Sequence, residues 1–231
     1  MANILIACEE SQTICRAFRE LGDTAFSADI QEPSGGYPEW HILGDVLPLI
    51  NGNCEFVTMD GTPHKINGRW DLLIAHPPYT YLSILNNRHL SPKCNTADKI
   101  NARLREREKA VLFFMEFINA DCDKICVENP IGYMNNHYRK PDQIIHPYYF
   151  AECELDITNY VKKATCLWLK NLPPLQRTSN LPPPTPLFYL STTGKAIHWT
   201  EGIKGEKRQR LRAKTFSGVA RAIAEQWGEL L

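Results

Sequence analysis

Short apolar runs alternate with amphipathic segments along most of the chain. Strands are predicted at residues 3–8, 25–29, 55–59, 72–75, 124–127 and 164–169, where apolar residues cluster over strand-like lengths. Helical spacing of apolar positions predicts helices at residues 11–21, 98–119 and 215–230. Because the first helix joins two successive strands, the pattern predicts a strand–helix–strand crossover and hence a parallel sheet. The predicted fold class is α/β.

Composition changes along the chain. Residues 31–69 are rich in Gly, Pro and Asn, with a short helix or turn expected at 45–50, and residues 84–97 form a polar stretch that we expect to be mobile. Prolines crowd residues 171–186, which excludes regular structure there. We therefore expect a core at 1–170, a Pro-rich and basic segment at 171–213, and a terminal helix at 214–231 that packs back on the core.

The overall composition is that of an ordinary globular protein. The chain has 231 residues, 43% of them apolar and 23% charged, enough for one domain with a full core. No apolar run is long enough for a membrane span, and the first residues carry no basic leader, so we expect a soluble protein that is not exported. The net charge of zero argues against a broadly basic nucleic-acid binder, although cations cluster at residues 204–214.

Cysteine usage argues against a metal centre. The eight cysteines are spread along the chain without a Cys-x-x-Cys pair, so a zinc site is disfavoured. Cys8, Cys126 and Cys166 lie inside apolar runs, as small buried residues do in a reducing compartment.

Polar residues that could bind a ligand or take part in catalysis follow the first predicted strands. Ser11 or Thr13 could cap the helix after the first strand, and the N–H groups of that helix terminus could hold an anionic ligand. Asp29 ends the second strand 20 residues beyond Glu9, the spacing of a ribose-binding carboxylate, although a solvated strand end explains it equally well. For Asp45, a role as the cap of a turn is favoured over a contact with an adenine amino group.

Two further strands end in loops that complement each other. The strand at 72–75 stops at His76-Pro77-Pro78-Tyr79, because neither proline has an N–H for a sheet ladder. The strand at 124–127 is followed by Glu128-Asn129-Pro130. An aromatic ring and a carboxylate around one crevice can stack on a flipped base and hydrogen-bond to its edge.

Taken in order with the terminal Lys214-Thr215-Phe216-Ser217-Gly218-Val219-Ala220, these motifs resemble S-adenosylmethionine-dependent DNA methyltransferases. They most resemble the small phage- and prophage-type proteins labelled cytosine-specific DNA methylases. The resemblance covers nearly the whole chain. It implies a Rossmann-like methyltransferase sheet, S-adenosylmethionine as cofactor, DNA as partner and a cytoplasmic location in a bacterium or a phage-infected cell. Whether a dimer supplies additional DNA-binding surface stays open.

The resemblance also implies roles for individual residues. The catalytic loops would supply His76, Pro77, Pro78, Tyr79, Glu128 and Asn129. Cofactor contacts would come from Cys8, Glu9, Glu10, Ser11, Asp29, Ile30, Asp45, Val46, His76 and Ser217. Asp29 would hold the ribose and Asp45 would lie near the adenine. DNA contacts would come from Lys162, Lys163, Lys207, Arg208, Arg210 and Arg212.

The motif departs from carbon-5 cytosine enzymes at one decisive position. Those enzymes need a cysteine where this chain has Tyr79, and a phenol with a pKa of about 10 is a poor replacement nucleophile. Pro-Pro-Tyr is similar to the loop of the amino-methyltransferases, although His76 replaces their usual Asp, Asn or Ser. We therefore expect methyl transfer to an exocyclic amino group, cytosine N4 or adenine N6. Tyr79 would stack the base, His76 and the Pro77 carbonyl would orient the amine, and Glu128 would read the ring edge.

Alternatives remain at this point. The chain could be a carbon-5 homologue without its nucleophile, or Cys94 could swing in as a displaced one. It could also be a catalytically silent DNA- or nucleotide-binding protein, or a transferase that acts on free nucleotides.

Overall fold

The computed structural model describes residues 1–186, 188–194, 196–197 and 215–231. Its central sheet comprises β1 (Asn3–Ala7), β2 (Thr24–Asp29), β3 (His41–Leu43), β6 (Leu72–Ala75), β7 (Ile125–Pro130), β8 (Gln143–Ile145) and β9 (Thr165–Lys170). The helices are α1 (Thr13–Glu20), α2 (Ala97–Ile118), α3 (Met134–His137) and α6 (Ser217–Gly228), with 3₁₀ helices η1 (Pro38–Trp40), η2 (Ile84–Leu90) and η3 (Pro147–Phe150). Two small sheets pair β4 (Cys54–Val57) with β5 (Pro63–Ile66) and β10 (Phe188–Tyr189) with β11 (Ala196–Ile197).

The seven-stranded sheet is mostly parallel, as the α/β prediction required. Its order is β3-β2-β1-β6-β7-β9-β8, and only β9 runs antiparallel to its neighbours. The chain leaves β1 toward one edge of the sheet and returns beside β1 as β6, so the winding reverses between these two strands. In open α/β sheets, ligands bind outside the carboxyl ends of the strands at such a reversal. The topology therefore directs attention to the residues that follow Ala7 and Ala75.

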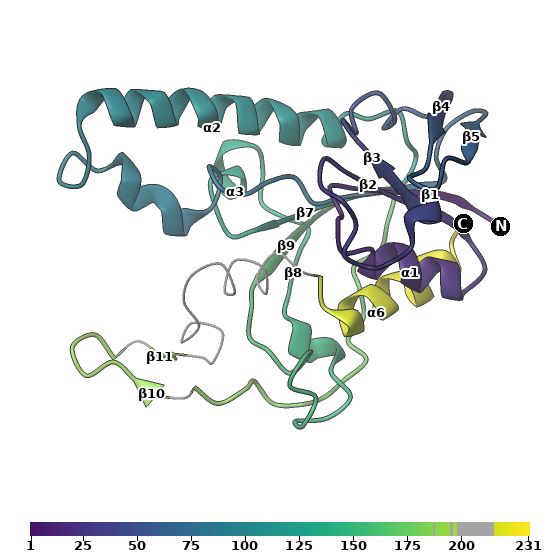
Figure 1. Ribbon diagram of the computed structural model, residues 1–231. Helices are drawn as coiled ribbons and strands as arrows, with labels where there is room; N and C mark the ends of the chain where they lie inside the picture. The colour runs from purple at the N-terminus through teal and green to yellow at the C-terminus, as the bar shows by residue number, and fades with distance from the viewer. Residues whose placement is uncertain (187, 195, 198–214) are drawn as a thin grey trace.

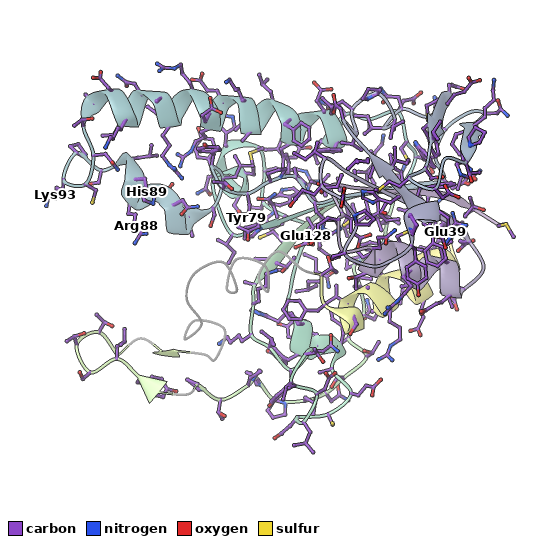
Figure 2. The ribbon with its side chains drawn as sticks, in the orientation of Figure 1. Glu39, Tyr79, Arg88, His89, Lys93 and Glu128 are labelled. Carbon is purple, nitrogen blue, oxygen red and sulfur yellow. The ribbon has the colours of Figure 1, made fainter. Side chains whose placement is uncertain are left out.

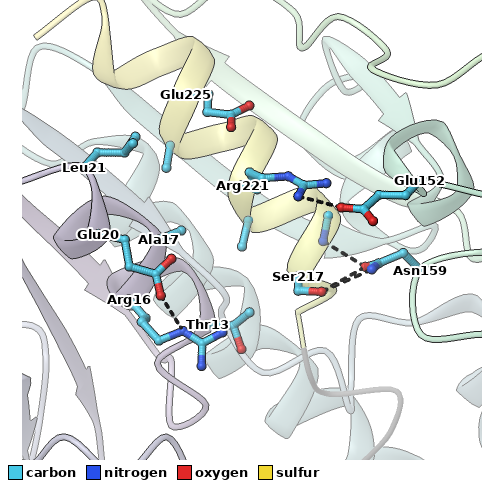
Figure 3. Close-up of a pocket in the computed structure, with 13 residues that line it drawn as sticks. Thr13, Arg16, Ala17, Glu20, Leu21, Glu152, Asn159, Ser217, Arg221 and Glu225 are labelled. Atoms are coloured by element: carbon cyan, nitrogen blue, oxygen red, sulfur yellow. Dashed lines mark hydrogen bonds and ion pairs between the residues drawn. The ribbon is translucent and has the colours of Figure 1, made fainter. Parts of the chain in front are cut away.

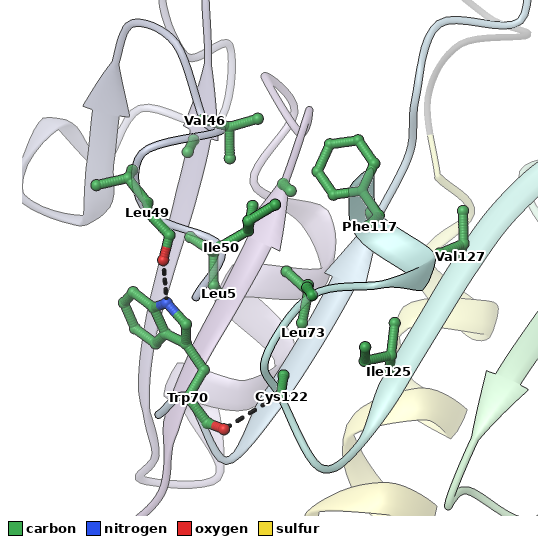
Figure 4. Close-up of a cluster of buried hydrophobic side chains, with 14 of the residues drawn as sticks. Leu5, Val46, Leu49, Ile50, Trp70, Leu73, Phe117, Cys122, Ile125 and Val127 are labelled. Carbon is green, nitrogen blue, oxygen red and sulfur yellow. Dashed lines mark hydrogen bonds between the residues drawn. The ribbon is translucent and has the colours of Figure 1, made fainter. Parts of the chain in front are cut away.

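Helices cover both faces of the sheet (Figure 1). Side chains alternate along β1, so that Ile4 and Ile6 pack with α1 and α6, whereas Leu5 and Ala7 pack on the side of α2. Trp70 anchors the second layer, because its indole N–H donates to the Leu49 carbonyl at 2.6 Å (Figure 4). The two buried layers fix the central strands and so define the positions of the loops that follow them.

Several predicted boundaries were wrong for physical reasons. Strand β7 continues through Glu128-Asn129-Pro130 because β9 pairs with these residues, although the pairing with β6 ends at Val127. The predicted strand at 55–59 lies outside the central sheet, in the β4–β5 hairpin. Strands β3, β5 and β8 are too short to show a period, and the stretch at 84–97 contains η2.

Candidate functional site

The loop after β1 makes a tight turn without glycine. Cys8 and Gln12 both have left-handed backbone conformations, with φ of 59° and 56°. The N–H groups of Cys8 and Glu9 both donate to the Ala28 carbonyl, at 2.7 and 3.3 Å. The Gln12 amide exchanges two hydrogen bonds with the backbone of Tyr37, at 2.8 and 3.1 Å. Backbone strain of this kind is typical of functional loops whose surroundings hold them in place.

Glu9 caps α1 from outside the helix. Its carboxylate accepts the N–H groups of Ile14 at 2.7 Å and Cys15 at 3.2 Å, and the residue is only 3% exposed. Of the predicted caps, Ser11 accepts the Thr13 N–H only at 3.5 Å, and the hydroxyls of Ser11 and Thr13 hydrogen-bond to each other at 3.0 Å, so Glu9 makes the main capping contacts. Burial raises the pKa of Glu9 to about 7, although His76 and the two amide bonds oppose the rise. The terminus predicted to hold an anion already holds this carboxylate.

Three predicted cofactor residues cluster next to this loop. Asp29 ends β2 and Asp45 follows β3, and each uses one oxygen to cap its own turn, accepting the N–H of Gln31 at 2.9 Å and of Leu47 at 3.0 Å. The pKa of Cys8 rises to about 12 through burial and then through the charges of Asp29 and Asp45, so its thiol stays protonated at neutral pH. These side chains form an acidic group at the carboxyl ends of β1, β2 and β3.

Neighbours of these aspartates differ in exposure. Ile30 is 79% exposed directly beyond Asp29, whereas Val46 is buried in the layer under α2. Glu10 is half-buried, and so is Ser11. Ile30 is therefore an exposed apolar side chain beside Asp29, whereas Val46 belongs to the core.

The loop after β6 begins with an ion pair. The His76 N–H donates to the Ala7 carbonyl at 2.9 Å, and the imidazole Nδ1 donates to the Glu128 carboxylate at 2.7 Å. Burial alone would lower the pKa of His76, but the negative charges of Glu128 and Glu9 outweigh it and raise the pKa. Burial alone would raise the pKa of Glu128, but His76 and Lys163 outweigh it and lower the pKa. The pair is therefore held in its charged form.

One atom of this pair lacks a partner. The Nε2 of His76 is buried and makes no hydrogen bond to any residue that the structure describes. A small cavity borders the pair and is lined by Lys163, Phe216 and Val219. Lys163, predicted as a DNA contact, lies near Glu128, with its ammonium 5.4 Å from the centre of the Phe216 ring.

Hydrogen bonds and close packing hold the rest of the loop in place. Asn129 is 2% exposed, and its amide donates to the Pro77 carbonyl at 2.8 Å. Tyr79 is half-buried, and its carbonyl accepts the N–H groups of Leu82 and Ser83 at 3.0 and 2.9 Å. Gly132 lies against this turn so closely that a Cβ would stand 2.1 Å from the Leu82 carbonyl oxygen.

Two arginines of α2 also hydrogen-bond to this loop, and the sequence analysis did not predict them. Arg103 donates to the Thr80 carbonyl at 3.1 Å, and Arg107 donates to the Tyr81 carbonyl at 3.0 Å. Arg107 is 7% exposed and lies over the ring of Tyr133. Both stand on the helix face of Phe114, at helical spacing, and a charge on an apolar face is the signal that could have found them.

Ser217 belongs to a different pocket. A groove of about 290 Å³ lies between α1 and α6, where Ser217 hydrogen-bonds to Asn159 (Figure 3). Two ion pairs, Arg16–Glu20 and Arg221–Glu152, neutralise much of its lining. Its wall contains neither His76 nor Tyr79, so we place the functional site at the carboxyl ends of the strands. Thr215 and Phe216, just before Ser217, line the cavity beside His76.

The remaining predicted DNA contacts are only partly described. Lys162 is exposed at the start of the segment that leads into β9. Lys207, Arg208, Arg210 and Arg212 lie outside the described residues. The described part of the chain contains no group of three or more metal-ligating side chains, and none of its helices could span a membrane.

Comparisons with known proteins add no identification. No protein-family model matches the chain, and no curated protein matches it. The methyltransferase resemblance therefore stays a prediction that depends on the motifs and on the geometry described above.

Proposed function

We propose that this protein transfers a methyl group from S-adenosylmethionine to an exocyclic amino group of a flipped DNA base, either N4 of cytosine or N6 of adenine. The observation that carries the proposal is the group of carboxyl side chains at the winding reversal, where Glu9 occupies the N-terminus of α1. In dinucleotide-binding sheets, that position receives the pyrophosphate. Because the Glu9 carboxyl group already occupies the N–H groups of this helix terminus, the site favours a nucleoside cofactor without a pyrophosphate.

The residues that follow β2 and β3 support the cofactor part of the proposal. When bound, S-adenosylmethionine supplies a methyl group activated by a sulfonium cation. Asp29 would hold the ribose hydroxyls and Asp45 the adenine amino group, each with the carboxylate oxygen that its own turn leaves unused. Ile30 would cover the adenine ring, since its side chain is already exposed beside Asp29.

The charged state of Glu128 supports an amino acceptor. A carboxylate accepts hydrogen bonds and cannot donate one to a ring nitrogen, so Glu128 fits the N–H of an exocyclic amine. A protonated His76 cannot accept from that amine, so it acts as a donor and holds Glu128 in place. As the amine nitrogen accepts the methyl group and the cofactor sulfur leaves with the bonding electrons, Glu128 would take up the surplus proton of that nitrogen.

The loop geometry supports base positioning. Asn129 holds the Pro77 carbonyl and leaves one lone pair of that oxygen for the amine. Tyr79 follows two prolines and is only half-buried, so its ring can stack on a base turned out of the helix. The thiol of Cys8, in the loop after β1, is protonated at neutral pH and cannot serve as a thiolate nucleophile.

Calorimetry and a transfer assay test the proposal together. The protein is titrated with S-adenosylmethionine and, as a pyrophosphate-containing dinucleotide for comparison, with NAD, and is then incubated with methyl-labelled cofactor and duplex DNA. We expect binding of S-adenosylmethionine but not NAD, with label transferred to the duplex. No binding of S-adenosylmethionine at millimolar concentration would overturn the proposal in favour of a silent binding protein, and equal label in free nucleotides would overturn the DNA acceptor.

The carbon-5 rival has its own test. Tyr79→Cys would restore the missing nucleophile, and the variant would form a covalent adduct with a duplex that contains 5-fluorocytosine. We expect no adduct, because the site is built for an amine. An adduct with the variant, together with an inactive parent, would establish the rival.

A further inference from the structure

A run of cations projects from the site on the segment between the Tyr79 loop and α2. Residues 84–103 contain Arg88, Lys93, Lys99 and Arg103 but a single carboxylate, that of Asp98. Arg88, Lys93 and Lys99 are exposed, and Arg103 is half-buried. Figure 2 shows Arg88, His89 and Lys93 on the part of the chain that extends away from Tyr79, with Arg88 directed away from α2. We call these four cations the basic shelf.

The shelf differs from the other charged surfaces of the protein. Elsewhere in the described part of the chain, exposed cations form ion pairs in Arg16–Glu20, Lys65–Glu55 and Arg69–Asp121, and those without a carboxylate partner are spread over separate segments. Within the described residues, no carboxylate pairs with any of the four shelf cations. Four unneutralised charges in one segment of a chain with zero net charge mark a surface that fits a polyanion.

Arg103 connects the shelf to the base pocket. Its guanidinium donates to the Thr80 carbonyl at 3.1 Å and lies 5.0 Å from the centre of the Tyr81 ring. Its Nε is buried and has no hydrogen-bond partner among the described residues. Thr80 directly follows Tyr79, so a phosphate held by the shelf would fix the strand next to the stacked base.

We propose that the basic shelf of Arg88, Lys93, Lys99 and Arg103 binds the phosphate backbone of duplex DNA beside the flipped base. The proposal rests on the proposed function, because it takes DNA as the acceptor. Phosphate contacts fix register without reading sequence, so the shelf sets where the duplex lies and leaves base choice to the pocket. It adds a DNA-binding surface to the segment at 171–213, which sequence analysis singled out.

The test compares two triple variants with equal loss of charge. Arg88→Ala/Lys93→Ala/Lys99→Ala removes three shelf cations and leaves Arg103 on the loop. Arg16→Ala/Lys65→Ala/Arg69→Ala removes three exposed cations that are paired elsewhere. Binding of a fluorescein-labelled duplex is measured by anisotropy across a series of salt concentrations, without cofactor. Circular dichroism confirms that both variants are folded.

We expect the shelf variant to bind at least tenfold more weakly at low salt. Its slope of log K against log salt should fall by about 2 to 3, since each lost phosphate contact contributes about 0.9. The control variant should keep the parent slope. Equal slopes in the two variants would overturn the shelf and leave the methyltransferase proposal intact. If the parent protein binds no duplex at low salt, both the DNA contact of the basic shelf and the choice of DNA as acceptor are overturned. If the parent binds duplex DNA through the shelf but transfers no methyl group, only the proposed function is contradicted.

Discussion

The two ends of the candidate site, one after β1 and one after β6 and β7, are held in place by different kinds of contact. At the β1 end, Asp29 and Asp45 are fixed by turns that each carboxylate makes with the residue two positions later. At the β6–β7 end, His76 bonds to Glu128 and Pro77 to Asn129, across 52 residues in each case. The first end is thus a set of local binding groups, and the second is a coupled unit whose charge state depends on distant chain segments.

This difference indicates a division of labour. Carboxylates fixed by local turns keep one oxygen for a ligand and suit cofactor binding. The His76–Glu128 pair joins two adjacent strand ends and holds a carboxylate in its charged form, which suits a group that takes up a proton. Glu9 joins the two ends, because it caps α1 and also raises the pKa of His76.

The largest expected effect is on chemistry at the β6–β7 end. Glu128→Gln keeps the shape but removes the negative charge, so the amine loses its proton acceptor. We expect the rate of methyl transfer to fall by a factor of about 10² to 10⁴, with cofactor affinity within twofold of the parent. Single-turnover assays and calorimetry measure the two quantities. Glu116→Gln, an exposed change on α2, serves as control; equal rates in parent and Glu128→Gln would remove Glu128 from the mechanism.

Next in size is a change at Gly132, which packs against the turn that follows Tyr79. Gly132→Ala puts a Cβ 2.1 Å from the Leu82 carbonyl oxygen, so either backbone must move. We expect the free energy of unfolding to fall by about 1–3 kcal/mol, as overpacked sites do. Urea denaturation measures it. Gly228→Ala is the matched control, because its nearest neighbours stand at 3.8 Å; the loop contact would be incidental if both variants unfolded alike.

The link between the two ends predicts an unusual pH dependence. The pKa of folded Glu9 is raised to about 7, so its contribution to stability is present below its unfolded pKa of about 4.3 and is lost as the pH rises through 7. His76, whose folded pKa is also raised, loses its contribution in the same direction above its ordinary value. Stability should therefore fall by about 1–3 kcal/mol between pH 5 and pH 8.

Thermal unfolding of the parent and of Glu9→Gln at several pH values measures this effect. The variant cannot titrate at position 9 and should show a flatter profile over the same range. Identical profiles in the two proteins would mean that Glu9 does not titrate in this window.

The smallest effect is expected at the β1 end. Asp29→Asn keeps the turn but weakens a charged hydrogen bond to the ribose, so cofactor affinity should fall about tenfold. The transfer rate at saturating cofactor should stay close to that of the parent, since Asp29 touches no reacting group. Calorimetry with Glu108→Gln as control checks the affinity. A large loss of rate at saturation would erase the proposed division between the two ends.

Sequence reasoning found the local features and missed the coupled ones. The parallel α/β sheet and the His76-Pro77-Pro78-Tyr79 loop were readable, because apolar runs and prolines act on neighbouring residues. Strands β3 and β8 were too short to show a period, and β7 was extended by pairing with β9, which depends on tertiary contacts. Only part of the fold was therefore open to prediction.

The site shows the same limit. That Glu9 caps α1 could not be read from spacing, because a helix cap usually comes from the residue just before the helix. The charge state of Glu128 follows from His76 and Lys163, which the fold brings together from separate segments. The Arg103 and Arg107 contacts were missed because a charged residue in a long helix ordinarily faces solvent.

The most direct test is mass spectrometry of nucleosides from DNA treated with the protein and isotopically labelled S-adenosylmethionine. We expect labelled N4-methylcytosine or N6-methyladenine, because the charged Glu128 and the stacking Tyr79 suit an exocyclic amine. Labelled 5-methylcytosine would contradict the assigned acceptor, and the absence of any labelled nucleoside from a protein that binds both cofactor and duplex would contradict the assigned reaction.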